Sequence, residues 1–329
     1  MKIGKMLTAG FLLALAVFFS CPLLAQPGPA TDPVNHYAVQ RATAPMTIDG
    51  HLHEFAWEAA AQIDGFERIL NDYDPIARPT RAKMLWDDDN FYFAFVCHDP
   101  DAWAIFDQED DPMWSEEVVE VFIDPDGDER NYLELEVNPL NAIVDLRILA
   151  LEPEWHASKE WDIKGLQTAV QMYGSVNDSL DQDLGWTVEI AIPWTAFADS
   201  ISGGGRPSPG ASWRLNLYRI ERMAGRDLKQ QINVLDEQAR PWRRQLADWR
   251  QEIGAESLEQ SDPENWRQQL SADQLHRLGQ IEEQLASFRE VRGPLDKRHH
   301  GSTEYTAWSE TYQRGFHHPA RFGVVHFVD

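Results

Sequence analysis

Hydrophobic and polar residues alternate in short segments over most of this chain. Residues 80–86 and 90–98 are two such segments, and Asp87-Asp88-Asp89 separates them as a polar turn. Further strand-like segments are 118–123, 131–138, 142–148, 165–173, 185–192, 212–219 and 322–327. Many short strands at near-regular spacing predict an all-β fold, namely an antiparallel β-sandwich of the jelly-roll or immunoglobulin-like kind.

The segment 131–138 has the most regular alternation. Its polar side is made of Tyr132, Glu134, Glu136 and Asn138, and its apolar side of Leu133, Leu135 and Val137. Successive side chains of a strand point to opposite faces of the sheet. We therefore expect one face of this strand to pack on a core and the other to meet solvent or a ligand.

The composition changes near the C-terminus, where Gln, Glu, Arg, Leu and Ala become frequent. Apolar residues recur there at helical intervals: Leu275, Leu278, Ile281, Leu285 and Phe288. Ser271 and Gln274 have the spacing of a capping box, which marks the start of a helix. The sequence therefore predicts an α-helical insertion at 237–298, between sandwich segments 37–236 and 299–329.

The N-terminal residues have the features of an export signal. Lys2 and Lys5 precede the apolar stretch 6–20, and a small residue, Ala25, follows shortly after it. This pattern predicts a signal peptide at 1–25. The apolar stretch is short for a bilayer core of about 30 Å. We therefore expect a periplasmic or extracellular protein without a transmembrane span in the mature chain.

The two cysteines bear on the leader and on redox chemistry. Residues 18–21 loosely resemble a lipoprotein cleavage site, so lipid anchoring at Cys21 is the second interpretation. Cleavage after Ala25 leaves Cys97 alone, which excludes an intramolecular disulfide. The Pro-, Gly- and Asp-rich residues 26–36 predict a flexible lead-in.

The chain is strongly acidic, with 29 basic and 54 acidic residues and a formal net charge of −25. Nucleic-acid binding requires clustered Lys and Arg, so this charge argues against a nucleic-acid partner. It favours a neutral partner over a polyanionic one.

Several segments, taken in order, resemble carbohydrate-binding module family 9. They are Ile48-Asp-Gly50 with Glu54-Phe-Ala-Trp57, 81–95, 114–125, 131–139, 185–194, and Trp308-Ser with 316–323. The resemblance covers residues 40–236 and 301–329, but not the insertion. It implies a β-sandwich related to DOMON domains. It also implies non-catalytic binding of an oligo- or polysaccharide. Modules of this family clamp a sugar between two tryptophans and carry structural calcium.

The same resemblance assigns residues to a sugar site. The clamp tryptophans are Trp114, six residues before Glu120, and Trp308. Flat indole rings suit the apolar faces of a pyranose, and polar groups suit its hydroxyls. The expected hydroxyl partners are Glu120, Glu136, Asn138 and Arg147.

One acidic turn is a candidate metal site. Asp124, Asp126 and Asp128 surround a glycine and offer closely spaced oxygen ligands of the kind that calcium prefers. Two interpretations stay open at this point, a structural calcium site and an acidic turn without metal.

Three other functions are compatible with the residues. A glycoside hydrolase would use a pair of carboxylates chosen from Glu116, Glu117, Glu120, Glu134 and Glu136. A haem-binding DOMON-type module would use Met84 or Met113 with a histidine, although the sequence contains no C-x-x-C-H attachment site. The helical insertion would suit the docking of an envelope protein. The sequence favours an exported, non-catalytic carbohydrate-binding protein associated with polysaccharide use.

Overall fold

The computed structural model describes the chain from residue 33 onward, with short gaps. The described ranges are 33–70, 75–151, 156–158, 160–198, 201, 203–262 and 265–329. The predicted signal peptide, residues 1–25, and most of the predicted lead-in lie outside these ranges, so both stay predictions.

The strands are β1 His36–Arg41, β2 Glu67–Arg68, β3 Thr80–Trp86, β4 Asn90–His98, β5 Val118–Asp124, β6 Tyr132–Val137, β7 Ile143–Ala150, β8 His156–Ser158, β9 Gln167–Tyr173, β10 Gly185–Pro193, β11 Ser212–Arg222, β12 Thr303–Ala307 and β13 Gly323–Phe327. The helices are α1 Phe55–Ala59, α2 Thr195–Ala198, α3 Gly225–Glu252, α4 Ala255–Ser261 and α5 Ala272–Gly301, with 3-10 turns η1 Met113–Ser115, η2 Trp266–Gln269 and η3 Pro319–Arg321. Every strand predicted from alternation is present, and the structure adds β1, β2, β8 and β12.

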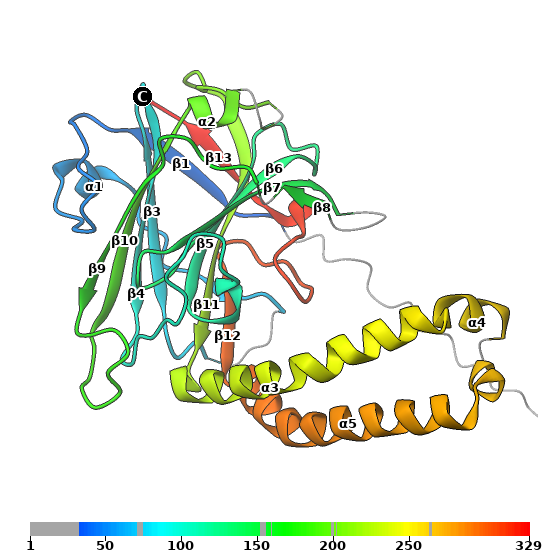
Figure 1. The fold of residues 1–329 in the computed structure, drawn as a ribbon. Coiled ribbons are helices and arrows are strands. Elements are labelled where there is room, and N and C mark those ends of the chain that lie inside the picture. Colours follow the sequence, from blue (N-terminus) through cyan, green and yellow to red (C-terminus); the bar gives the residue numbers. More distant parts are fainter. Residues whose placement is uncertain are drawn as a thin grey trace, which may run out of the picture. The chain divides into compact units, whose positions relative to one another are not determined.

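The strands form a sheet in the order β8-β7-β6-β5-β11-β13-β1-β3-β4-β10-β9, and β12 pairs with β11 and β2. Its two halves pack against each other around one apolar core (Figure 1). Phe93 and Ile190 enter this core from β4 and β10, and Val121 and Leu135 enter it from β5 and β6. This mostly-sheet arrangement is consistent with the predicted sandwich.

The strand that joins the two halves departs from the antiparallel prediction. β1 pairs in parallel with β13 on one side and with β3 on the other. Parallel neighbours need a long connection rather than a tight turn. β1 satisfies this requirement because β13 is the last strand of the chain, and α1 and β2 separate β1 from β3.

Both faces of β6 are buried, whereas the alternation left one face open to solvent or ligand. Leu133 and Leu135 pack in the main core, as expected. The opposite face carries Tyr132, Glu134 and Glu136, and it is covered in part by a second apolar cluster that includes Phe316. Residues that follow β12 therefore roof the outer face of β5 and β6.

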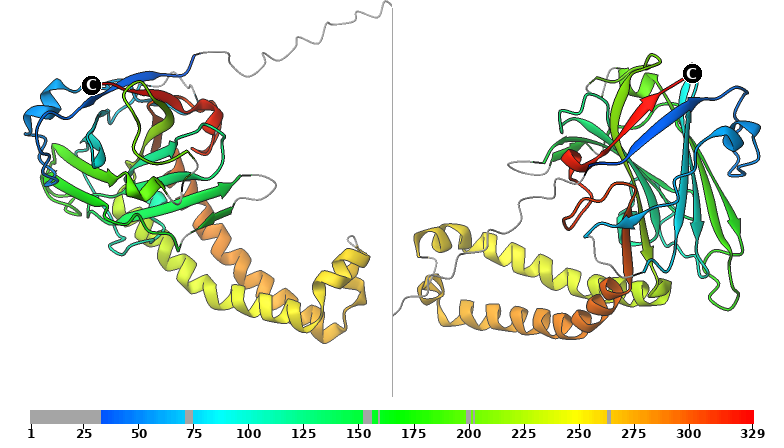
Figure 2. Two further views of the ribbon diagram at one scale, coloured as in Figure 1. Left: turned by 90° about the horizontal axis from the view of Figure 1, so that it is seen from above. Right: turned by 180° about the vertical axis from the view of Figure 1, so that it is seen from behind.

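The helical segment is longer than predicted. It begins at Gly225 rather than at 237 and ends at Gly301, and α3 and α5 lie side by side along it (Figure 2). The prediction started late because the family resemblance was extended to residue 236, although Leu228 and Ile232 already form a buried helical stripe. Gly225 has a φ of +77°, a conformation that glycine adopts without strain as the chain leaves β11.

The predicted capping box begins α5. The Ser271 hydroxyl accepts a hydrogen bond from the Gln274 amide at 3.2 Å, and the Gln274 side chain accepts one from the Ser271 amide at 2.8 Å. At the far end of the hairpin, Trp249, Trp266 and Leu278 form a small separate core. Among the described residues, no helix combines the length and apolar composition of a membrane span.

Replacing Phe93 with alanine should lower the free energy of unfolding by about 3–5 kcal/mol, because Phe93 is fully buried between the two halves of the sheet. Phe55→Ala is the matched control, since the Phe55 side chain is 71% exposed on α1. We expect the control to change stability by less than about 0.5 kcal/mol. Urea denaturation followed by circular dichroism measures both values, and equal effects would contradict the assigned core.

Candidate functional site

A cleft of about 1200 Å³ lies over the outer face of β5 and β6. Its floor contains Glu120, Glu134 and Glu136. The helix side of the cleft comes from the sheet-proximal ends of α3 and α5, and a further side comes from the chain after α5. Representative residues of these two sides are Lys229, Arg292, His299, Tyr305, Phe316 and His317.

The floor is a cluster of buried carboxyl groups. Glu120 on β5 lies directly opposite Glu136 on β6, and Glu134 occupies the same face of β6. One carboxylate oxygen from each residue lies within 4.8 Å of the other two. Burial raises the pKa of all three groups, that of Glu134 to about 8, and repulsion between the carboxylates raises the pKa of Glu120 and Glu136 further.

His317 lies beside this floor. The Tyr132 hydroxyl and His317 Nδ1 are 2.6 Å apart, and His317 Nε2 lies 3.6 Å from a carboxylate oxygen of Glu134. Burial lowers the pKa of His317 to about 4. The imidazole is therefore neutral at pH 7 and brings no positive charge to the floor.

The side of the cleft next to the helices is basic. Arg222, at the end of β11, donates to the Trp114 carbonyl and to the Thr303 hydroxyl, both at 2.9 Å. Its guanidinium group lies over the Tyr305 ring, 5.2 Å from the centroid. Burial lowers the pKa of Lys229, whose side chain lines the same part of the cleft. The cleft thus combines an acidic floor with a basic side.

Trp114 lies in η1 and lines the cleft with a side chain that is 42% exposed. Part of its indole ring is therefore open to a ligand. Glu120 and Glu136 line the same cleft, so the structure brings together three of the residues that the sequence predicted for the sugar site.

Trp308 occupies a different position. Its side chain is 4% exposed and belongs to the main core, where its ring meets Tyr37 edge-on at 6.4 Å. Gly323 packs against it so closely that a Cβ at this position would lie 2.5 Å from the indole. The predicted tryptophan pair is therefore not assembled, and this burial argues against a stacking role for Trp308.

The Asn138 side chain makes its hydrogen bonds outside the cleft. Its amide nitrogen donates to Phe106 and Glu116, both at 2.8 Å, and its oxygen accepts from Leu140 at 3.0 Å and Ala142 at 2.9 Å. These bonds hold the turn after β6. Asn138 is fully buried and does not line the cleft, which argues against its predicted role as a hydroxyl partner.

Arg147 lies on the other side of the sheet. It is opposite Leu133 in the β6–β7 register, so it shares the core-facing side of β6. Glu134 and Glu136 occupy the opposite side. This position argues against the predicted role of Arg147 in the same sugar site.

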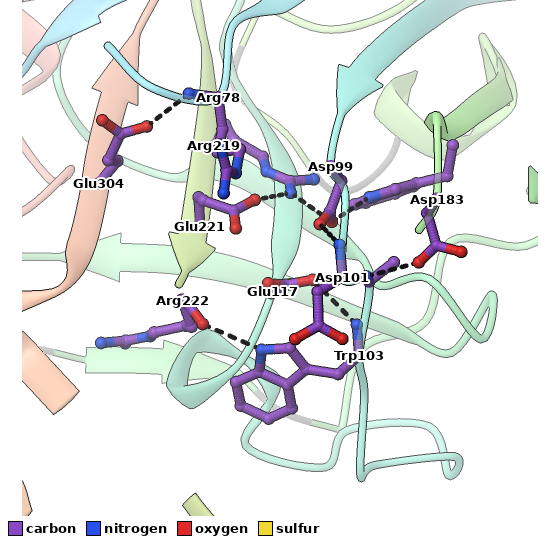
Figure 3. Close-up of polar contacts among 12 residues, drawn as sticks. Arg78, Asp99, Asp101, Trp103, Glu117, Asp183, Arg219, Glu221, Arg222 and Glu304 are labelled. Atoms are coloured by element: carbon purple, nitrogen blue, oxygen red, sulfur yellow. Dashed lines mark hydrogen bonds and ion pairs between the residues drawn. The ribbon is translucent and has the colours of Figure 1, made fainter. Parts of the chain in front are cut away.

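A second charged cluster surrounds Arg219 of β11 and lies between this strand and the ends of β4 and β10 (Figure 3). The guanidinium group pairs with Asp99 at 3.1 Å and with Glu221, and it lies over the Trp186 ring at 4.6 Å. Glu117 accepts from the Trp103 amide at 3.1 Å within the same cluster. The structure therefore separates Glu117 from the cleft glutamates, with which the sequence grouped it as a candidate catalytic carboxylate.

Residues 48–244, more than half of the chain, match the sequence profile of a family described as carbohydrate family 9 binding domain-like. The chain belongs to this family. The match includes the strands that carry Glu120, Glu134 and Glu136, and it confirms the resemblance found in the sequence. Membership supports non-catalytic sugar binding at the general level.

Two solved structures are similar to this family member. A candidate carbohydrate-binding protein from Bacteroides uniformis ATCC 8492 has 13% identity and a TM-score of 0.53, with 89% of this chain and 99% of that protein covered. A family 9 module from Caldicellulosiruptor kristjanssonii, in complex with cellotriose, has 18% identity and a TM-score of 0.39, with 57% of this chain and 77% of that module covered. The first similarity shows the fold alone. No curated protein matches the chain.

The acidic turn after β5 does bring its three aspartates together. One oxygen from each of Asp124, Asp126 and Asp128 lies within 4.8 Å of the others. The Asp124 carboxylate already accepts hydrogen bonds from the amides of Gly127 and Glu129, both at 3.0 Å. Calcium at this turn stays a prediction.

Met84 and Met113, the methionines considered for haem, are both fully buried, and they belong to two different apolar clusters. The basic side of the cleft was not predicted. Lys229 lies in the segment that the resemblance assigned to the sandwich, and Arg292 lies in the insertion, for which the family gave no counterpart. The only available signal was the helical stripe that starts at Leu228.

We expect the free energy of unfolding of this protein to fall between about pH 5 and pH 8 because of Glu221. Burial, with repulsion from Asp99, raises the pKa of Glu221 to about 7, above the ordinary value of about 4.3. The folded state then holds a proton that unfolding releases. This stabilisation is full below about pH 4.3 and is lost as the pH rises through the folded pKa.

Urea denaturation at several pH values checks this expectation. Glu221→Gln should flatten the fall in unfolding free energy between pH 5 and pH 8, whereas Glu283→Gln, on the exposed side of α5, should leave it unchanged. An identical pH dependence in wild type and Glu221→Gln would rule out this group as the cause.

Alanine substitution should affect stability differently at the two tryptophans. Trp308→Ala should lower the free energy of unfolding by about 3–5 kcal/mol, since it empties part of the main core. Trp114→Ala should change it by less than about 1 kcal/mol, because much of the side chain is exposed. Circular dichroism in urea measures both, and the reverse order would contradict the positions described here.

Proposed function

We propose that the cleft over β5 and β6 binds carbohydrate without cleaving it. The observation that carries the proposal is the partly exposed indole of Trp114 beside a floor of buried carboxyl groups. An indole stacks on the apolar face of a pyranose, while carboxylates accept hydrogen bonds from its hydroxyls. Membership of the family 9-like group supports the same conclusion.

In this proposal the sugar stacks on one tryptophan rather than between two. Trp114 is the aromatic platform, and Glu120 and Glu136 are the hydroxyl partners below it. Trp308, Asn138 and Arg147 have no part, since their side chains are buried in the core, bound to a turn or on the other face of the sheet. The sheet-proximal ends of α3 and α5 form the side that a second tryptophan would otherwise supply.

Export is the other part of the proposal. Residues 1–25 have the order of charged, apolar and small residues that a signal peptide requires. Carbohydrate binding in the periplasm or outside the cell would place the protein among those that serve the use of polysaccharides.

Titration calorimetry with glucose, cello-oligosaccharides, xylo-oligosaccharides and the best ligands from a glycan array tests the proposal. Trp114→Ala should weaken binding at least tenfold, equivalent to about 1.4 kcal/mol, because the platform is lost. Glu136→Gln should weaken it as well. Phe55→Ala removes another exposed aromatic ring, on α1, and Trp308→Phe keeps an aromatic ring in the core, so both should bind normally.

Absence of binding to every glycan, or binding that Trp114→Ala leaves unchanged, would overturn the sugar site. A reducing-end assay on each ligand addresses the second half of the proposal. We expect no release of sugar, and release that Glu136→Gln abolishes would make the protein a glycoside hydrolase instead.

A further inference from the structure

If ionised, the three carboxyl groups of the cleft floor would carry more negative charge than the surrounding groups balance. Glu120 and Glu136 are direct cross-strand neighbours, an arrangement that is unfavourable for like charges. One oxygen of Glu134 and one of Glu136 are buried and make no hydrogen bond to any described residue. Buried carboxyl groups are normally neutralised by a proton, paired with a cation, hydrogen-bonded or bound to a metal ion.

Three of the arginines that line the cleft are held by other partners. Arg68 pairs with Glu304 at 2.7 Å, and Arg292 pairs with Asp236 at 3.1 Å. Arg222 acts on Glu120 from a distance, while its nitrogens donate to Trp114 and Thr303. Among the described residues, no ion pair joins Arg or Lys to Glu134 or Glu136.

The position of His317 adds to this picture. Its Nδ1 contacts the Tyr132 hydroxyl, which orients the ring so that Nε2 lies 3.6 Å from the unpaired oxygen of Glu134. This distance is longer than a hydrogen bond. A histidine that binds a metal ion through one nitrogen is normally fixed through the other, as Tyr132 fixes the ring of His317 here.

We propose that Glu120, Glu134 and Glu136 bind one divalent cation at the floor of the cleft. Oxygen ligands favour hard ions, namely Ca²⁺, Mg²⁺ or Mn²⁺. Two oxygens bound to one ion lie at most twice an ion–oxygen distance apart, which is about 5 Å for Ca²⁺ and about 4 Å for Mg²⁺. The three carboxylate oxygens meet the limit for Ca²⁺, since all lie within 4.8 Å of one another.

Two other acidic clusters of the described residues are less suited to this role. Asp99, Glu117 and Glu221 surround the Arg219 guanidinium group, which already supplies positive charge. Asp126 and Asp128 are exposed on the turn after β5. The cleft floor combines full burial, three carboxylates and unpaired oxygens.

Calorimetry and thermal unfolding of the full chain test the proposal in the absence of any sugar, so the result does not depend on the proposed function. The protein is treated with EDTA, dialysed and titrated separately with Ca²⁺, Mg²⁺ and Mn²⁺. We expect one ion per chain and a Tm that rises with ion concentration, because the ion binds only the folded state.

Two variants supply the decisive signature. Glu134→Gln and Glu136→Gln should each weaken ion binding at least tenfold. Each should also raise the Tm in EDTA, because glutamine is neutral and removes the cost of burying a carboxyl group either charged or with an extra proton. Glu283→Gln, on the exposed side of α5, is the control and should bind the ion like wild type. Asp126→Asn tests the acidic turn after β5 separately, and it should leave the ion at the cleft floor in place.

Circular dichroism verifies that each variant is folded, and Glu120→Gln replaces any variant that is not. The proposal is overturned if none of the three ions binds, if binding survives the glutamate variants, or if Asp126→Asn alone abolishes it. A lower Tm for both glutamine variants in EDTA would also contradict it, since it would mean that the carboxylates stabilise the fold without an ion.

Discussion

The candidate site depends on the pairing of β5 with β6, which places Glu120 directly opposite Glu136 and brings Glu134 onto the same face. The other face of these strands packs in the main core, so a shift in register by one residue would turn the carboxylates into apolar surroundings. The position of the acidic floor is therefore fixed by the requirement to bury Val121, Leu135 and their neighbours. The same two strands therefore carry the main core on one face and the candidate site on the other.

Local features of the sequence were sufficient where the structure depends on neighbours in the chain. The hairpin of β3 and β4 follows from alternation on both sides of Asp87, whose carboxylate accepts from the amides of Asp89 and Asn90. The start of α5 follows from Ser271 and Gln274. The alternation of β6 likewise identified the face that carries Glu134 and Glu136, although not the roof above it.

Contacts between distant segments could not be predicted in this way. The burial of Trp308 depends on Tyr37 and Gly323, which come from the first and last strands. The basic side of the cleft depends on helices that the family resemblance does not include, so motif matching gave no position for Lys229 or Arg292. Motifs placed the residues of each strand correctly but did not indicate which of them share a cavity.

The helical segment has a further consequence for the evolution of this protein. β11 and β12 are antiparallel neighbours, and Arg222 pairs with Thr303 at the point where the helices leave the sheet. The residues between Arg222 and Thr303 therefore form the loop of a single β-hairpin. The entropic cost of closing such a loop grows only with the logarithm of its length. Insertions and deletions at the distal end of α3 and α5 are therefore compatible with an unchanged sheet, so relatives can differ in helix length while they keep the same cleft floor.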